Sequence, residues 1–168
     1  MGLGRYLSIP VLFIAIILQT TVIPEIRVAR GGPDLILMMV VSWGLLTDLD
    51  EGFWWAIVGG IYQDLSSGLP TGVSALALVI IVFLNKLALG TIERTNIFVP
   101  PLVIAVTTVL YHLLLIAALA ALNRPVPILP SLAEVTLPTV IFNFVLMVPM
   151  FRLMGAIFEA SRPRSVSL

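Results

Sequence analysis

The sequence contains no cysteine and only one histidine, His112. Without cysteine there can be no disulfide bond, thiolate metal site or cysteine nucleophile. Metal sites in proteins combine several ligating side chains, and one histidine without cysteine does not supply them. We therefore expect neither a metal ion nor another cofactor.

Charged residues are scarce as well. They make up 11% of the 168 residues, whereas 60% are hydrophobic; soluble domains usually carry about 25% charged residues. A core of this size cannot bury such an excess of apolar side chains, so the solvent must be lipid. The nine basic and nine acidic residues cancel, and no long basic run suits nucleic acid. The composition predicts an integral membrane protein that does not bind nucleic acid.

Apolar runs of membrane-spanning length fill most of the chain, and a span needs roughly 20 such residues. The first run is too long for a signal peptide, so we expect a retained helix. Three carboxylates between the second and third runs would each cost about 2.5 kcal/mol or more at mid-membrane, which favours two short helices over one fused helix. We predict an all-α integral membrane protein of about six transmembrane helices, two of them short, with five spans or re-entrant segments as alternatives. The predicted spans are residues 6–23, 35–46, 52–64, 72–89, 97–122 and 132–158.

Residues 1–158 are therefore predicted to form a single polytopic transmembrane domain, and residues 159–168 a short polar tail. Cytoplasmic loops carry an excess of lysine and arginine. With six spans, the side that holds the termini carries six basic residues and the other side three, so both termini are predicted to be cytoplasmic. The six are Arg5, Lys86, Arg94, Arg152, Arg162 and Arg164, and the three are Arg27, Arg30 and Arg124.

Small residues recur every four positions in "GFWWAIVGGIYQDLSSGLPTG". Residues four apart share one face of a helix, and small residues let helices approach closely in lipid. Pro70 cannot continue the helix, which predicts a tight turn in "SSGLPTG". We expect this face to pack against another helix of the chain or of a partner. On the helix its members are Gly52, Ala56, Gly60 and Asp64; the same spacing reaches Gly68 and Gly72 in the turn, and all six are candidates for helix packing or partner contact.

Asp64 allows three interpretations. It can fix the turn by accepting hydrogen bonds from the "SSG" backbone, it can contact a partner chain packed on the small-residue face, or it can be a proton or cation site, because intramembrane acids often mark pathways. The third is the weakest, because no second ionisable group accompanies Asp64 at its depth.

Two further polar side chains lie in apolar segments. His112 is expected to make a hydrogen bond between helices inside the bundle, and Asn143 to hold a helix pair, either within the chain or across to a partner. A second small-residue face is "AALAAL", residues 117–122, and Pro138 and Pro149 are expected to bend the last helix. No serine lies near His112 in the sequence and no phosphate-binding loop is present, so we predict that the protein is not an enzyme.

The order of several motifs resembles the family of rod-shape-determining MreD proteins. These motifs are "LQTTVIP", "GGPDLILMMVVSWGLL" and "GFWWAIVGGIYQDLSSGLPTGVSALAL", the last with Asp-x-x-Ser-Gly and Pro-x-Gly at its turn. The resemblance implies a fold like that of the substrate-binding subunits of energy-coupling-factor transporters. It also implies a non-enzymatic component of the bacterial cell-wall elongation machinery in the cytoplasmic membrane. The implied partners are an MreC-like bitopic membrane protein and, indirectly, a RodA-type glycosyltransferase, a class B penicillin-binding transpeptidase and MreB.

Our leading hypothesis is therefore a membrane scaffold whose small-residue face around Gly60 and Asp64 docks the bitopic partner. The alternative is the substrate-binding membrane subunit of a vitamin transporter, for which the candidate ligand-binding residues are Arg27, Arg30, Asn123 and Arg124. A third possibility, an intramembrane hydrolase, lacks a catalytic pair.

Overall fold

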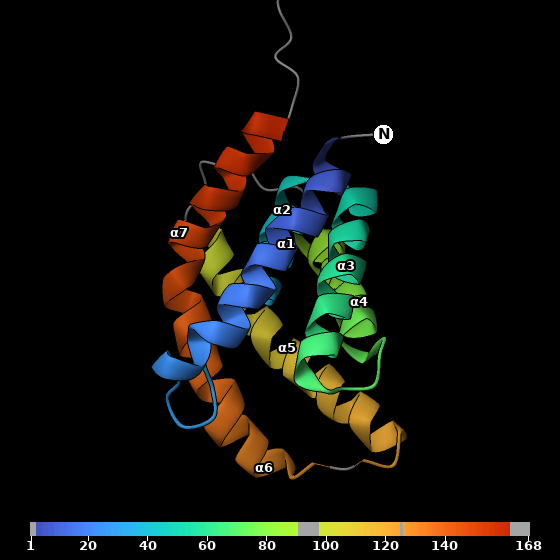
Figure 1. Cartoon of the computed structure of the whole chain (residues 1–168), viewed down its shortest axis with the longest axis vertical. Coiled ribbons are helices and arrows are strands. Elements are labelled where there is room, and N and C mark those ends of the chain that lie inside the picture. The colour runs from blue at the N-terminus through green and yellow to red at the C-terminus, as the bar shows by residue number, and fades with distance from the viewer. Residues whose placement is uncertain (1–2, 91–97, 125, 162–168) are drawn as a thin grey trace, which may run out of the picture.

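The computed structural model describes residues 3–90, 98–124 and 126–161, and within these ranges the chain is helical apart from short connections (Figure 1). Three of the helical stretches are long and apolar enough to cross a membrane, and two shorter helices are also apolar. The elements are α1 (Leu3–Thr21), η1 (Ile23–Ile26), α2 (Leu35–Leu46), α3 (Leu49–Ser67), α4 (Val73–Leu89), α5 (Val99–Ala121), α6 (Ile128–Ser131), η2 (Leu132–Thr136) and α7 (Leu137–Ser161).

The prediction of an all-helical chain with six main helices is confirmed for the described residues, but one of the two predicted short helices is wrong. α2 has the predicted 12 residues, whereas α3 has 19 and not about 12. Two of the three acidic residues after α2 do not lie outside α3: Asp50 and Glu51 are in its first turn, and Asp48 is its N-cap residue. Carboxylates are favourable there because the amide end of a helix carries partial positive charge.

α2 is the central helix of the bundle and packs against α1, α3, α4, α5 and α7. All of its residues except Leu35 are buried. A helix that is apolar on all sides is usually buried among other helices. At 12 residues, roughly 18 Å at 1.5 Å per residue, α2 is shorter than a membrane is thick. Its first amides therefore lie inside the protein and need partners there.

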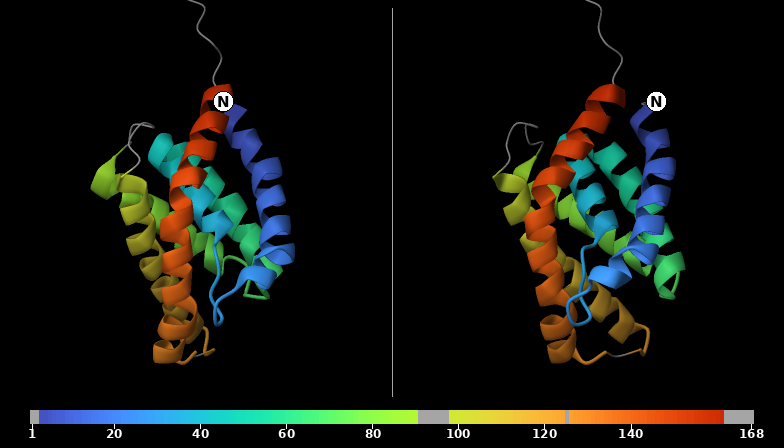
Figure 2. Two further views of the ribbon diagram at one scale, coloured as in Figure 1. Left: turned by 90° about the vertical axis from the view of Figure 1, so that its left-hand side faces the viewer. Right: turned by 60° about the vertical axis from the view of Figure 1, so that its left-hand side comes forward.

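The start of α1 and the end of α7 lie at the same end of the molecule, and α6 lies at the opposite end (Figures 1 and 2). At the first of these ends, Trp43 stacks on Trp55 with 4.3 Å between ring centroids. The Nε1–H of Trp55 donates to the carbonyl of Gly4 at 3.0 Å, which joins α3 to α1. α7 continues to Ser161, beyond the predicted boundary at residue 158, and residues 162–168 lie outside the described ranges.

The last helical stretch changes its winding directly before Pro138. η2 is a five-residue π-helical segment, and Pro138 follows as the second residue of α7. Proline has no N–H to donate, so the carbonyl of Glu134 loses its α-helical partner. The backbone N–H of Arg30, in the connection between α1 and α2, donates to that carbonyl at 3.0 Å. The irregular winding thus anchors this connection to the start of α7.

Candidate functional site

The small-residue face of α3 is closed by α4 of the same chain. A methyl group added at Gly60 would lie 2.2 Å from the Cα and 2.4 Å from the N of Ala75, and one at Gly52 would lie 2.9 Å from Val82. Ala56, between these glycines, is fully buried. The four-residue spacing does mark a helix-packing surface, but the hypothesis that this surface docks a partner does not fit, because α4 already occupies it.

Asp64 caps the N-terminus of α4. Its side chain is buried, and its two carboxylate oxygens accept from the amides of Gly72 at 2.6 Å and Ser74 at 2.8 Å. These amides would otherwise lack partners at the start of a helix. The turn-fixing interpretation is therefore correct in kind, but the two amides lie at the last residue of the turn and in the first turn of α4, and not in "SSG".

Gly68 and Gly72 form the turn itself and do not pack against a helix. Their φ angles are +69° and +103°, and no atom lies within 4 Å of an added Cβ at either position. A side chain at these φ values is strained, so glycine is required here for backbone conformation. Both residues leave the small-residue face, which ends at Asp64.

Asn143 and Asp34 lie at the centre of a hydrogen-bond network at the first turn of α2. The side-chain oxygen of Asn143 accepts from the backbone N of Asp34 at 2.9 Å, and its nitrogen donates to Thr108 of α5 at 3.0 Å. The carboxylate of Asp34 accepts from the amide of Leu37 at 3.0 Å and from Gln63 of α3 at 2.9 Å. Asn143 thus holds helices together within the chain, which is one of its two predicted roles.

Gln19 of α1 adds a third cap, because its side-chain oxygen accepts from the amide of Ile36 at 3.1 Å. Side chains from α1 and α7, together with Asp34, therefore satisfy three amides at the buried end of α2. The sequence prediction did not include Asp34, Gln19 or Gln63. An aspartate directly before an apolar run is a helix-start signal and could have identified Asp34; no comparable signal marks the two glutamines.

His112 lies between two hollows at the end of the bundle remote from the termini. Its Nδ1 lies 2.9 Å from the hydroxyl oxygen of Thr136, which links α5 to η2 and fits the predicted interhelical hydrogen bond. In the described part of the chain, no three histidine or carboxylate side chains are grouped to hold a metal ion.

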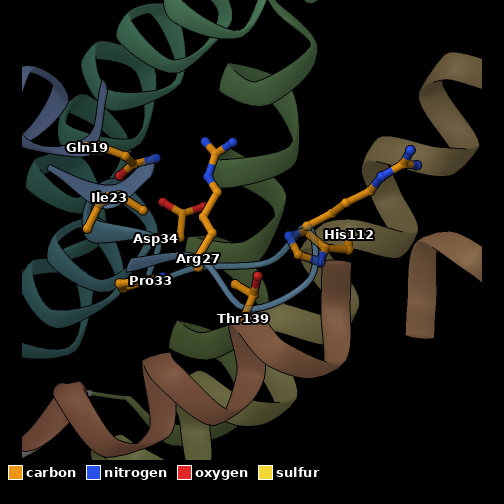
Figure 3. A pocket seen from close by; sticks show the side chains of 9 residues that line it. Gln19, Ile23, Arg27, Pro33, Asp34, His112 and Thr139 are labelled. Atoms are coloured by element: carbon orange, nitrogen blue, oxygen red, sulfur yellow. The ribbon is translucent and has the colours of Figure 1, made fainter. Parts of the chain in front are cut away.

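The first hollow is a polar cavity of about 160 Å³. Figure 3 shows Gln19, Asp34 and His112 around it, from α1, the start of α2 and α5. Arg27 and Arg30 line it from the connection between η1 and α2, and Thr139 lines it from α7. The two arginines that the sequence suggested as ligand-binding candidates are thus brought together with His112. Asn123 and Arg124 do not line this cavity.

The family model for the rod shape-determining protein MreD matches residues 2–159. The chain belongs to the MreD family. No curated protein and no solved structure matches it. The predicted likeness of this MreD chain to subunits of energy-coupling-factor transporters therefore stays a prediction.

Membership in the MreD family establishes that the chain is a non-enzymatic membrane protein with a role in rod shape determination. The matched range includes every residue of the α3–α4 contact, the caps of α2 and the polar cavity. Within it, the segment "GGIYQDLSSGLPTG" of the motif that resembles the family forms a close helix pair, in which Gly60 of α3 contacts α4 and Asp64 caps α4.

Proposed function

We propose that this MreD protein is a membrane scaffold of the cell-wall elongation machinery and that it binds an MreC-like bitopic partner. The observation that supports the proposal is the shape of the chain: the described residues lie almost wholly in packed helices with short connections. Such a protein acts on another through the outer surfaces of its helices or through those connections. Both termini are cytoplasmic in this proposal, as the distribution of basic residues indicates.

The surface proposed for the partner is the outer face of α5, and not the small-residue face of α3. Small residues at its C-terminal end, Ala117, Ala120 and Ala121, are exposed. They lie within about 100° of one another around the helix axis, since each residue turns an α-helix by about 100°. Leu113 and Leu110 continue the same exposed face toward the start of α5. Small residues let a partner helix approach closely and gain dispersion contacts in lipid.

The test is co-purification of the MreC-like partner from cells in mild detergent. Ala117→Leu with Ala121→Leu enlarges the proposed surface without touching the interior, so the isolated protein should insert and melt as before. We expect the partner to be lost and cells that depend on this variant to become round. Val145→Leu, an equally exposed change on α7, is the matched control and should retain the partner.

Unchanged co-purification by the double variant would refute the α5 surface. Absence of any bitopic partner from purifications of the unaltered protein would refute the scaffold function itself.

The vitamin-transporter alternative is not favoured. Sites for drug-sized ligands and cofactors usually measure about 300–1,000 Å³ and are largely apolar. The polar cavity measures about 160 Å³, so by itself it is too small for such a molecule, and its lining is mainly polar.

A further inference from the structure

Two hollows of opposite character meet at His112. The polar cavity of about 160 Å³ lies on one side, and an apolar groove of about 220 Å³ lies on the other. The groove runs between α5 and η2 and is lined by Leu115, Ile116, Leu119 and Val135. His112 lines both hollows, so a molecule that filled both would have one polar and one hydrocarbon part.

The residues that line the polar cavity carry a net positive charge, because two arginines, Arg27 and Arg30, accompany one acidic side chain, Asp34. Among the described residues, the side chain of Arg27 has no hydrogen bond and no ion pair with an acidic group, although Arg27 lines the cavity. Arg30 makes only a long ion pair with Glu134, at 3.6 Å, and its side chain is 78% exposed. Two guanidinium groups at one polar cavity are suited to a phosphate group, because each presents several N–H donors in a plane.

The acidic side chain that lines the cavity, Asp34, is not paired with either arginine. Both oxygens of Asp34 are already used, one by the amide of Leu37 and the other by Gln63. Asp34 therefore serves the end of α2, and no ion pair joins it to Arg27 or Arg30.

The segment that presents the arginines is fixed in place. Val28 and Gly31 exchange backbone hydrogen bonds of 3.0 and 3.1 Å, which form a tight turn with Ala29 and Arg30 at its tip. Ala29 has a φ of +54°, an unusual conformation for a residue other than glycine. An added Cβ at Gly31 would lie 2.4 Å from the carbonyl oxygen of Val135 in η2 and 2.9 Å from the Cβ of Pro138, so this turn lies directly against η2 and the start of α7. The arginines are thus held beside the cavity before any ligand arrives.

The geometry points to a site for a single membrane lipid with an anionic phosphate headgroup, a role beyond that of a scaffold. The phosphate lies in the polar cavity and accepts hydrogen bonds from Arg27 and Arg30. A hydrocarbon chain of the same lipid lies in the apolar groove along Leu115 and Leu119. A lipid fits better than a free anion, because the groove begins at the same histidine and is lined mainly by hydrocarbon.

The test is native mass spectrometry of the full chain, purified in a neutral detergent and titrated with phosphatidylglycerol or with phosphatidylcholine. We expect one phosphatidylglycerol molecule to be retained in preference to phosphatidylcholine. Arg27→Gln with Arg30→Gln should weaken its binding at least about tenfold, the factor for one lost charge-assisted hydrogen bond. Arg27→Gln alone should have a smaller effect in the same direction and is the fallback if the double variant does not fold.

Two further variants test whether the position of the arginines matters and whether the hydrocarbon chain contributes to binding. Arg124→Gln removes an exposed arginine that lies after α5 and outside the cavity, and it should leave binding unchanged. Leu119→Trp fills the groove and should weaken lipid retention while leaving the arginines in place.

Equal retention of the two lipids, or undiminished retention by the arginine variants, would overturn the proposal. Inorganic phosphate that displaces phosphatidylglycerol at equal concentration would also overturn it, because the hydrocarbon chain would then contribute nothing.

Discussion

Gly60 of α3 and Ala75 of α4 approach so closely that the backbone of one helix occupies the place of a side chain on the other. An added Cβ at Gly60 would lie 2.2 Å from the Cα of Ala75 and 2.4 Å from its N. Backbone atoms cannot move aside as a flexible side chain can. This contact, together with the cap from Asp64, fixes α3 and α4 as one rigid pair.

Gly60→Ala should therefore destabilise the protein by at least roughly 2 kcal/mol, toward the upper part of the usual range for overpacking. Thermal unfolding in detergent measures the effect. Gly44→Ala is the matched control, because its new methyl would meet only the side chain of Val82, at 3.3 Å, and should cost less. Adding Ala75→Gly should not rescue Gly60→Ala, since the nearest atoms belong to the backbone. Equal melting of Gly60→Ala and the unaltered protein would contradict this account.

Asp64→Asn should lower stability by roughly 1–3 kcal/mol, because an amide can accept from only one of the two backbone N–H groups and its own NH₂ faces the other. Asp50→Asn serves as the control on the same helix: its side chain is 84% exposed, and its ion pair with Arg5 is 3.9 Å long. Chemical or thermal unfolding of the two variants should separate them clearly. A loss no larger for Asp64→Asn than for Asp50→Asn would show that the cap contributes little.

Asn143→Leu should leave the backbone N–H of Asp34 without its partner and should cost roughly 1–3 kcal/mol. Thr108→Val removes the hydroxyl group that accepts a hydrogen bond from the side-chain nitrogen of Asn143. Valine has nearly the same shape as threonine, so this change should lower stability less. Because Asn143 and Thr108 share one hydrogen bond, the double variant should lose less stability than the sum of the single losses. A double-mutant cycle of unfolding free energies measures this coupling, and strict additivity would argue against the bond.

Trp54 and Trp55 are neighbours in the chain and should respond differently to replacement by phenylalanine. Trp55 is buried, stacks on Trp43 and donates to Gly4, so Trp55→Phe should destabilise the protein by roughly 1–2 kcal/mol. Trp54 is 43% exposed, and Trp54→Phe should change stability by about 0.5 kcal/mol or less. Thermal unfolding followed by far-ultraviolet circular dichroism distinguishes them. The reverse order would contradict the described packing.

The sequence predicted the helices well where local physics decides their ends. Pro70 and the positive-φ glycines at 68 and 72 end α3 and start α4, as the motif indicates. The start of α3 was predicted three residues too late, because acidic residues that interrupt an apolar run also suit the first turn of a helix. The spacing of the apolar residues does not tell whether such acidic residues lie in a loop between two helices or in the first turn of the second helix.

The contacts between distant segments in the candidate site could not be predicted from the spacing of residues along the sequence. The four-residue period correctly identifies a close-packed face on α3, but it does not tell whether the helix that covers Gly60 belongs to the same chain. Asn143 meets the backbone of Asp34 across 109 positions of sequence. Arg27 and His112 share a cavity only because α5 and the connection before α2 meet in space. Such pairings follow from the topology and cannot be read from either segment.

The caps of α2 bear on the order in which the protein can be made. α2 leaves the ribosome early, yet the group that satisfies the N–H of Asp34 belongs to Asn143, near the end of translation. Until α7 has entered the bilayer, the backbone N–H of Asp34 at the start of α2 has no hydrogen-bond acceptor from Asn143, and the side of α2 that packs against α7 is uncovered. A chain terminated before residue 143 is therefore a natural substrate for membrane quality-control proteases, and completion of the last helix closes the whole molecule.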